Sequence, residues 1–113
     1  MVYDRAKQLA DEMRQSDEYR AYCAAKERAY SAESTRNLLS EYHRLRTRAQ
    51  AYALSGERND ALLAKLQKLG ELLQFDADAA EYLLAEYRLT EMLGDVYKIL
   101  AQAVEMDIGD LEA

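Results

Sequence analysis

The side chains best suited to chemistry in this sequence are one histidine, one cysteine and several glutamates that each precede a tyrosine. His43 is the only histidine, and its neighbours at helical spacing are aliphatic, hydroxyl-bearing or basic. None of them is a carboxylate that could orient the imidazole ring or share a metal ion with it, and a metal site needs several convergent ligands. We therefore predict that His43 is an exposed surface residue.

Cys23 stands on the tyrosine-bearing face of an expected helix, beside Tyr19 and Tyr22. A catalytic thiol needs a histidine and an amide or carboxylate partner, and His43 is predicted to lie on the polar side of another helix. We therefore predict that Cys23 is a small buried hydrophobe. A single cysteine also forms no intrachain disulfide bond, which fits a reducing, cytoplasmic location.

Four glutamate–tyrosine pairs occur, at Glu18-Tyr19, Glu41-Tyr42, Glu81-Tyr82 and Glu86-Tyr87. Acid–base catalysis requires two carboxylates that converge in a pocket, whereas a helix turns each glutamate about 100° away from the adjacent tyrosine. The sequence also carries no glycine-rich phosphate loop, nucleophile elbow or zinc-ligand spacing. We predict that the protein is not an enzyme and holds no cofactor.

The segment HRLRTR is the one locally basic region. Its arginines, with one upstream, are a candidate contact for RNA: Arg36, Arg44, Arg46 and Arg48. On a helix these side chains spread over the whole polar arc, whereas a nucleic-acid footprint gathers on one face. The net charge of −6 also disfavours attraction to polyanions. We favour a solvated helix whose arginines pair with acidic residues, such as those at Asp76, Asp78, Glu81 and Glu86; direct RNA binding through residues 36–48 is the alternative.

The elements that carry these residues are predicted to be helices, because good helix formers dominate and proline is absent. Apolar periodicity places them at about residues 2–15, 17–30, 32–54, 60–74 and 77–105. Ser16 is expected to cap the second helix and Ser31 the third, and Gly56 to end the third. Asp76 or Asp78 is expected to cap the last helix.

The two longest segments carry apolar residues at alternating spacings of three and four, as in packed antiparallel helices. In the third segment these are Thr35, Leu38, Tyr42, Leu45, Ala49 and Tyr52. The last helix would be about 44 Å long, longer than the roughly 34 Å diameter of a compact chain of this size. The sequence therefore predicts an all-α, elongated antiparallel bundle of about five helices, two of them long, that forms a dimer.

Three stretches together resemble the YlbF/YmcA family of small helical bacterial proteins, including its YheA-like branch. They are VYDRAKQLADEMRQSDEYRAY, LLSEYHRLRTRAQAYALSGE and DADAAEYLLAEYRLTEMLGDVYKIL. The first contains the family's Ser-x-Glu-Tyr-x-x-Tyr pattern, here Ser16, Glu18, Tyr19 and Tyr22. The last matches at Tyr82, Leu83, Ala85, Glu86, Leu89, Leu93 and Val96. One departure is Asp76-Ala77, where the family commonly has Asn-Pro.

The resemblance implies a non-catalytic regulator that acts in complexes with paralogues to modulate the endoribonuclease RNase Y, and through it competence, sporulation and biofilm formation. Complexes of family members can carry iron–sulfur clusters, which want about four thiolates, so Cys23 would supply at most one.

We therefore expect one helical domain over residues 1–105 and an acidic tail over residues 106–113. The expected partners are a second copy of the chain, family paralogues, or both, with RNase Y as a further partner and neither a membrane nor nucleic acid. The expected interaction residues are Tyr19, Tyr22, Tyr82, Glu86, Leu89, Leu93, Val96, Tyr97 and Leu100.

Overall fold

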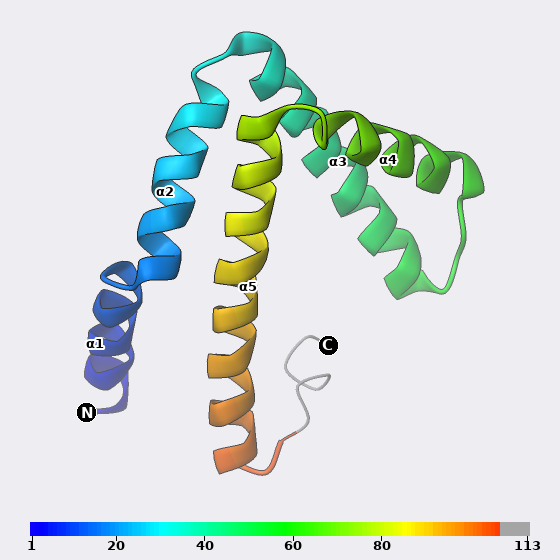
Figure 1. Cartoon of the computed structure of the whole chain (residues 1–113). Coiled ribbons are helices and arrows are strands. Elements are labelled where there is room, and N and C mark those ends of the chain that lie inside the picture. The colour runs from blue at the N-terminus through cyan, green and yellow to red at the C-terminus, as the bar shows by residue number, and fades with distance from the viewer. Residues whose placement is uncertain (107–113) are drawn as a thin grey trace. The chain divides into compact units, whose positions relative to one another are not determined.

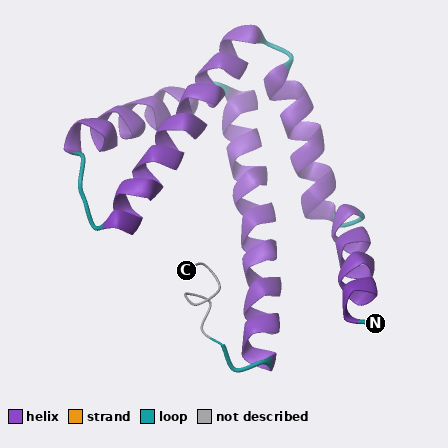
Figure 2. Cartoon of the chain, turned by 180° about the vertical axis from the view of Figure 1, so that it is seen from behind, coloured by secondary structure: helices purple, strands orange, loops and turns teal. Residues whose placement is uncertain are grey.

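The computed structural model describes residues 1–106, which form five α-helices and no strand (Figures 1 and 2). They are α1 (Val2–Arg14), α2 (Asp17–Tyr30), α3 (Glu33–Ser55), α4 (Asp60–Leu73) and α5 (Ala77–Ala103). The longest are α3, with 23 residues, and α5, with 27. The prediction of an all-α chain of five helices, two of them long, is confirmed.

The helices group into two compact units. Unit 1 joins Met1–Cys23 to the chain from Leu84 onward, and unit 2 is Ala24–Leu83. The expectation of a single domain over residues 1–105 stays a prediction, and residues 107–113 of the expected acidic tail lie outside the described residues. None of the helices in residues 1–106 combines the length and apolar character that crossing a lipid bilayer requires.

A sharp corner separates α1 from α2 at Gln15 and Ser16 (Figure 1). The Tyr19 backbone N–H donates a hydrogen bond to Ser16 Oγ at 3.2 Å, and Ser16 Oγ in turn donates to the Met13 carbonyl. Asp17 and Glu18 occupy the first turn of α2, where the helix dipole favours negative charge. The predicted Ser16 cap is confirmed, and it ends one helix while starting the next.

The start of α3 differs from the prediction. α3 begins at Glu33, after an N-cap at Ala32 that makes no side-chain hydrogen bond. The Ser31 hydroxyl instead donates to the Arg28 carbonyl at 2.7 Å. The predicted Ser31 cap was wrong because that side chain satisfies a free carbonyl at the end of α2.

Unit 2 contains most of the core. Its fully buried large side chains are Leu39, Leu73 and Tyr82. The Tyr82 ring lies 5.6 Å from the Tyr30 ring, so α2 and α5 meet there. α3 and α4 lie side by side, and Leu45, Leu62 and Leu69 are buried in this unit (Figure 1).

The α3 seam departs from the prediction at one position, whereas Thr35 and Leu45 are buried as predicted. Leu38 is 37% exposed, whereas Leu39 is completely buried. The heptad pattern assumes one straight line of contact, but the start of α3 meets the α4–α5 junction while the rest packs on α4. The buried face therefore turns around the helix along its length.

The start of α3 is tied to the start of α5. Thr35 is buried and donates a hydrogen bond to Asp76 Oδ2. Asp76 Oδ1 accepts from the N–H groups of Asp78 and Ala79, at 3.1 and 3.2 Å. Of the two predicted caps, Asp76 is therefore the one that is formed, and it also makes a tertiary contact.

The α3–α4 connection follows local turn chemistry. Gly56 ends α3 in the left-handed region at φ 77°, which glycine adopts without strain. Asn59 then caps α4, because its side-chain oxygen accepts from the Leu62 N–H at 3.0 Å. These two residues fix where both helices end, and thereby position the side chains near the hairpin tip.

Candidate protein-interaction surface

α1 contributes no residue to the buried core. Its apolar residues recur at helical spacing, yet no residue of α1 is buried, and Val2 is 78% exposed. Leu9 and Met13 are only half-buried. A helix of 13 residues is marginal in water unless an apolar face is packed. Among the described residues, the chain provides no complete cover for this face.

The second half of α5 and the residue that follows it expose a line of large apolar side chains, which we call the α5 stripe: Leu93, Tyr97, Leu100 and Val104. Their spacing of four, three and four places them within about 60° of one another on the helix. Between 45% and 64% of each side chain is exposed. The stripe belongs to unit 1, as does α1, and such an apolar line on a helix is typical of an interaction surface.

The expected interaction residues fall into three groups. Leu93, Tyr97 and Leu100 are exposed and belong to the α5 stripe. A second group is half-buried: Tyr19, Tyr22, Glu86, Leu89 and Val96. Tyr82 is only 2% exposed and belongs to the core of unit 2. The α1 face was absent from the expected set, although the periodicity of Val2, Ala6, Leu9 and Met13 could have indicated it.

The prediction of a buried Cys23 was wrong, because its side chain is exposed. The buried residues of α2 are Ala25 and Ala29, and Cys23 projects about 160° away from Ala25. A hydrogen bond between Tyr19 and the Cys23 thiol raises the pKa of Tyr19 above its ordinary value. The thiol therefore faces solvent, next to the phenol one turn earlier.

The prediction of an exposed His43 was also wrong. Its side chain is half-buried, its Nε2 atom is buried, and its ring packs edge-on against Tyr82 at 5.9 Å. Because Tyr82 of α5 covers this flank of α3, the buried arc of α3 is wider than a single seam. Within residues 1–106, no three His, Cys, Asp or Glu side chains cluster in a way that could hold a metal ion.

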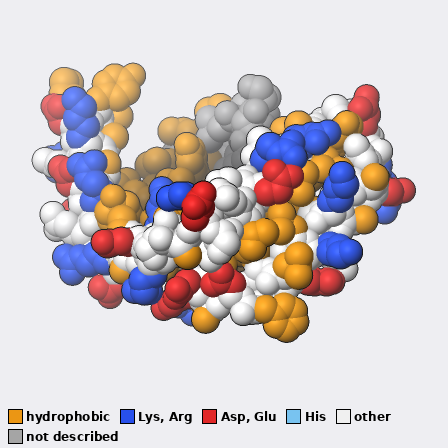
Figure 3. All heavy atoms as spheres, turned by 90° about the horizontal axis from the view of Figure 1, so that it is seen from above, with side chains coloured by type: hydrophobic (Ala, Val, Ile, Leu, Met, Phe, Trp, Pro, Cys, Tyr) orange, Lys and Arg blue, Asp and Glu red, His pale blue; other side chains and the backbone are white. Residues whose placement is uncertain are grey.

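The arginines of α3 do not act as one basic face. Within residues 1–106, Arg44 pairs with Glu41 of its own helix. Arg46 lies over the Tyr42 ring, 5.6 Å from its centroid. Of the acidic residues expected to take these pairs, Glu81 binds Arg28 of α2 at 3.1 Å. Figure 3 shows positive and negative side chains interspersed over the visible surface, which is unlike a nucleic-acid footprint.

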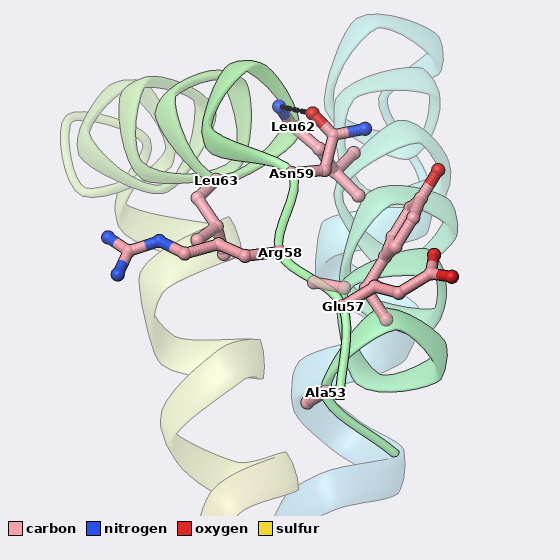
Figure 4. A pocket seen from close by; sticks show the side chains of 8 residues that line it. Ala53, Glu57, Arg58, Asn59, Leu62 and Leu63 are labelled. Atoms are coloured by element: carbon pink, nitrogen blue, oxygen red, sulfur yellow. Dashed lines mark hydrogen bonds between the residues drawn. The ribbon is translucent and has the colours of Figure 1, made fainter. Parts of the chain in front are cut away.

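A cavity of about 270 Å³ opens at the tip of the α3–α4 hairpin (Figure 4). Its walls are mostly apolar and include Tyr52, Ala53 and Leu63. The Asn59 side-chain oxygen points to the Leu62 N–H, and Glu57 and Arg58 extend to opposite sides of the loop (Figure 4). The polar groups at this cavity do not converge on a point inside it, so it offers no catalytic arrangement.

The described chain is thus an all-α protein whose most conspicuous functional feature is uncovered apolar helix surface. Residues 2–105 match the family model described as control of competence regulator ComK, YlbF/YmcA. The chain therefore belongs to the YlbF/YmcA family.

Relatives and solved structures agree with this assignment. The chain is 34% identical over 108 residues to a UPF0342 protein of Symbiobacterium thermophilum, covering 95% of this chain and 96% of the relative. It is also 34% identical over 112 residues to a UPF0342 protein of Halothermothrix orenii, covering 98% and 95%.

Two solved structures share the fold. A DUF964 protein of unknown function from Bacillus stearothermophilus superposes with a TM-score of 0.77 at 18% identity, over 92% of each chain. Bacillus subtilis RicA, crystallised in complex with RicF, superposes with a TM-score of 0.61 at 19% identity, over 92% of this chain and 93% of that one.

Proposed function

We propose that this protein is a non-catalytic regulatory subunit that works by binding other proteins through α1 and the α5 stripe. The observation that carries the proposal is the amphipathic α1, which has no buried residue. A helix of this length gains its stability from tertiary packing, so a folded α1 implies a partner that covers it. The α5 stripe adds four large apolar side chains to the surface of the same unit.

The partners that we propose are a second copy of this chain and paralogues of the same family. Membership of the YlbF/YmcA family supports this choice, and the RicA–RicF complex is a precedent for pairing by a protein of this fold. By resemblance to the family, we further propose that the resulting complex acts in the cytoplasm on RNase Y-dependent RNA processing, and thereby on competence, sporulation or biofilm formation.

The proposed self-association is tested by sedimentation velocity on the chain and on two matched variants. Leu100→Asp places a charge on the α5 stripe, whereas Leu54→Asp makes the same change at an exposed leucine near the end of α3 in unit 2. We expect a dimer that Leu100→Asp dissociates and Leu54→Asp leaves intact, since burying an unpaired charge is costly. A strict monomer at tens of micromolar, or equal effects of both variants, would contradict the proposed self-association.

The paralogue and RNase Y arm is tested by co-purification from the native bacterium with tagged chain and with the same two variants. We expect paralogues and RNase Y to accompany the chain and the Leu54→Asp variant, and to be lost with Leu100→Asp. Recovery of neither, or recovery that is unaffected by Leu100→Asp, would reject the proposed surface as the route to these partners.

A further inference from the structure

A second, smaller cavity of about 140 Å³ lies along the pair formed by α3 and α4. Three cationic side chains from the two helices line it: Arg44 and Arg48 of α3, and Lys65 of α4. We call this cavity the α3–α4 basic pocket. It lies within unit 2, on the flank of Leu62 opposite the apolar cavity described above, because Lys65 and Leu63 project to opposite sides of α4.

The charges in the α3–α4 basic pocket do not cancel. Glu41, the only acidic residue in its lining, is already paired with Arg44. Arg48 and Lys65 form no ion pair within residues 1–106, so the pocket carries two uncompensated positive charges. The pKa of Glu41 lies below its usual range, first because of the Arg44 hydrogen bond and further because of the Lys65 and Arg48 charges. In a chain with a net charge of −6, this concentration of positive charge is unlike the average surface.

The N-terminal end of α4 adds backbone donors to the same pocket. Ala61, the second residue of α4, is part of the lining, and its N–H has no acceptor in the described part of the chain. The Asn59 cap satisfies the Leu62 N–H instead. Helix N-termini carry partial positive charge and bind oxyanions through such free N–H groups.

We propose that the α3–α4 basic pocket binds a phosphate dianion, either inorganic phosphate or the terminal phosphate of a small monoester. A dianion balances the two charges that remain on Arg48 and Lys65, whereas a carboxylate leaves one unbalanced. Each phosphodiester of RNA also carries a single charge, and the net negative charge of the chain repels a long polyanion. The tetrahedral group would receive hydrogen bonds from Arg48, Lys65 and the Ala61 N–H.

The test is a titration followed by two-dimensional NMR of the backbone amides, at constant ionic strength held with chloride. Phosphate, glycerol 3-phosphate, sulfate and acetate are added separately. At mildly alkaline pH, where the first three are dianions, we expect them to give saturable shifts of the Ala61 and Leu62 signals, and we expect weaker binding of acetate. Equal affinities for phosphate and glycerol 3-phosphate would identify the free phosphate group as the whole ligand, and tighter binding of the ester would identify a small phosphomonoester.

Matched variants locate the site. Arg48→Gln and Lys65→Gln are each expected to weaken phosphate binding about tenfold, since each removes a charge-assisted hydrogen bond. Arg36→Gln on α3 and Lys68→Gln on α4 remove the same charges outside the pocket lining and should leave the affinity unchanged.

Three results would overturn the proposal. They are the absence of saturable shifts at Ala61 and Leu62, equal losses in the pocket and control variants, and tighter binding of a short single-stranded RNA than of phosphate through the same two residues. The last result would establish the RNA contact instead. None of these measurements depends on the oligomeric state, so this proposal and the proposed interaction function can fail separately.

Discussion

The hydrogen bond between Thr35 and Asp76 gives the sharpest prediction about stability. Asp76→Ala removes the cap of α5, which costs about 1 kcal/mol. It also leaves the buried Thr35 hydroxyl without its acceptor, which costs about 1–3 kcal/mol more. We therefore expect the free energy of unfolding to fall by about 2–4 kcal/mol, a large share of the roughly 5–15 kcal/mol typical of a folded domain.

Milder substitutions separate the contribution of the α5 cap from that of the Thr35 hydrogen bond. Asp76→Asn keeps one oxygen for the cap, and its amide N–H can donate to the Thr35 hydroxyl, so we expect a loss of about 1 kcal/mol or less. Asp78→Ala is the matched control, because Asp78 is the neighbouring first-turn acid and its carboxylate makes no hydrogen bond within residues 1–106. The assay is urea denaturation followed by circular dichroism, at a fixed protein concentration because association adds to apparent stability.

The Thr35–Asp76 hydrogen bond also predicts that the free energy of unfolding depends on pH. Hydrogen bonds from Thr35 and then from the Ala79 N–H hold the pKa of Asp76 below its ordinary value in the folded chain. A lowered folded pKa contributes stability that is fully present above the unfolded value of about 3.9, and that is lost as pH falls through the folded value. The stability difference between the wild type and Asp76→Asn should therefore be constant near neutrality and shrink below about pH 4.

A double-mutant cycle decides whether the contact itself is responsible. Thr35→Val removes the hydroxyl with little change in volume, and Asp76→Ala should cost clearly less in that background because no buried donor is then left unpaired. If Asp76→Ala cost the same in both backgrounds, or no more than Asp78→Ala, the reasoning from the buried hydroxyl would be refuted.

Two further substitutions and one labelling experiment test other parts of the chain. Ser16→Ala should lower the free energy of unfolding by about 1 kcal/mol through loss of the α2 cap, with no loss of partner binding; unchanged stability together with lost binding would make this corner an interaction site instead. Gly70→Ala should raise the free energy of unfolding by up to about 1 kcal/mol, because alanine favours the helix more than glycine does. The added Cβ has room, since it would meet Tyr42 Cε1 at an ordinary contact distance of 3.5 Å. A lower free energy of unfolding in the same urea assay would show that the helices pack more closely there. Cys23 should react with a thiol reagent in the native chain as fast as in urea, and strong native protection would contradict its exposure.

Local features of this chain were predictable because their causes lie within a few residues. The Ser16 cap, the Gly56 stop and the α5 cap, which was narrowed to Asp76 or Asp78, each depend on one residue and the backbone next to it. The YlbF/YmcA resemblance was likewise carried by short patterns in order, and the match over residues 2–105 confirms it. The sequence did not separate exposed interaction residues from core residues. Periodicity marks an apolar residue in the same way whether it is buried, as Tyr82 is, or exposed, as Leu100 is.

The sequence by itself determined the helices, several of their ends and the family, since capping and periodicity act over one or two turns of the chain. Only the tertiary structure decided which faces are covered. It packed the half-buried His43 against Tyr82, which lies 39 positions later, and it left Cys23 in solvent. It also brought Arg48 and Lys65 to one pocket, although they belong to different helices. Burial and net local charge arise from contacts between distant segments, so no pattern within one helix can specify them.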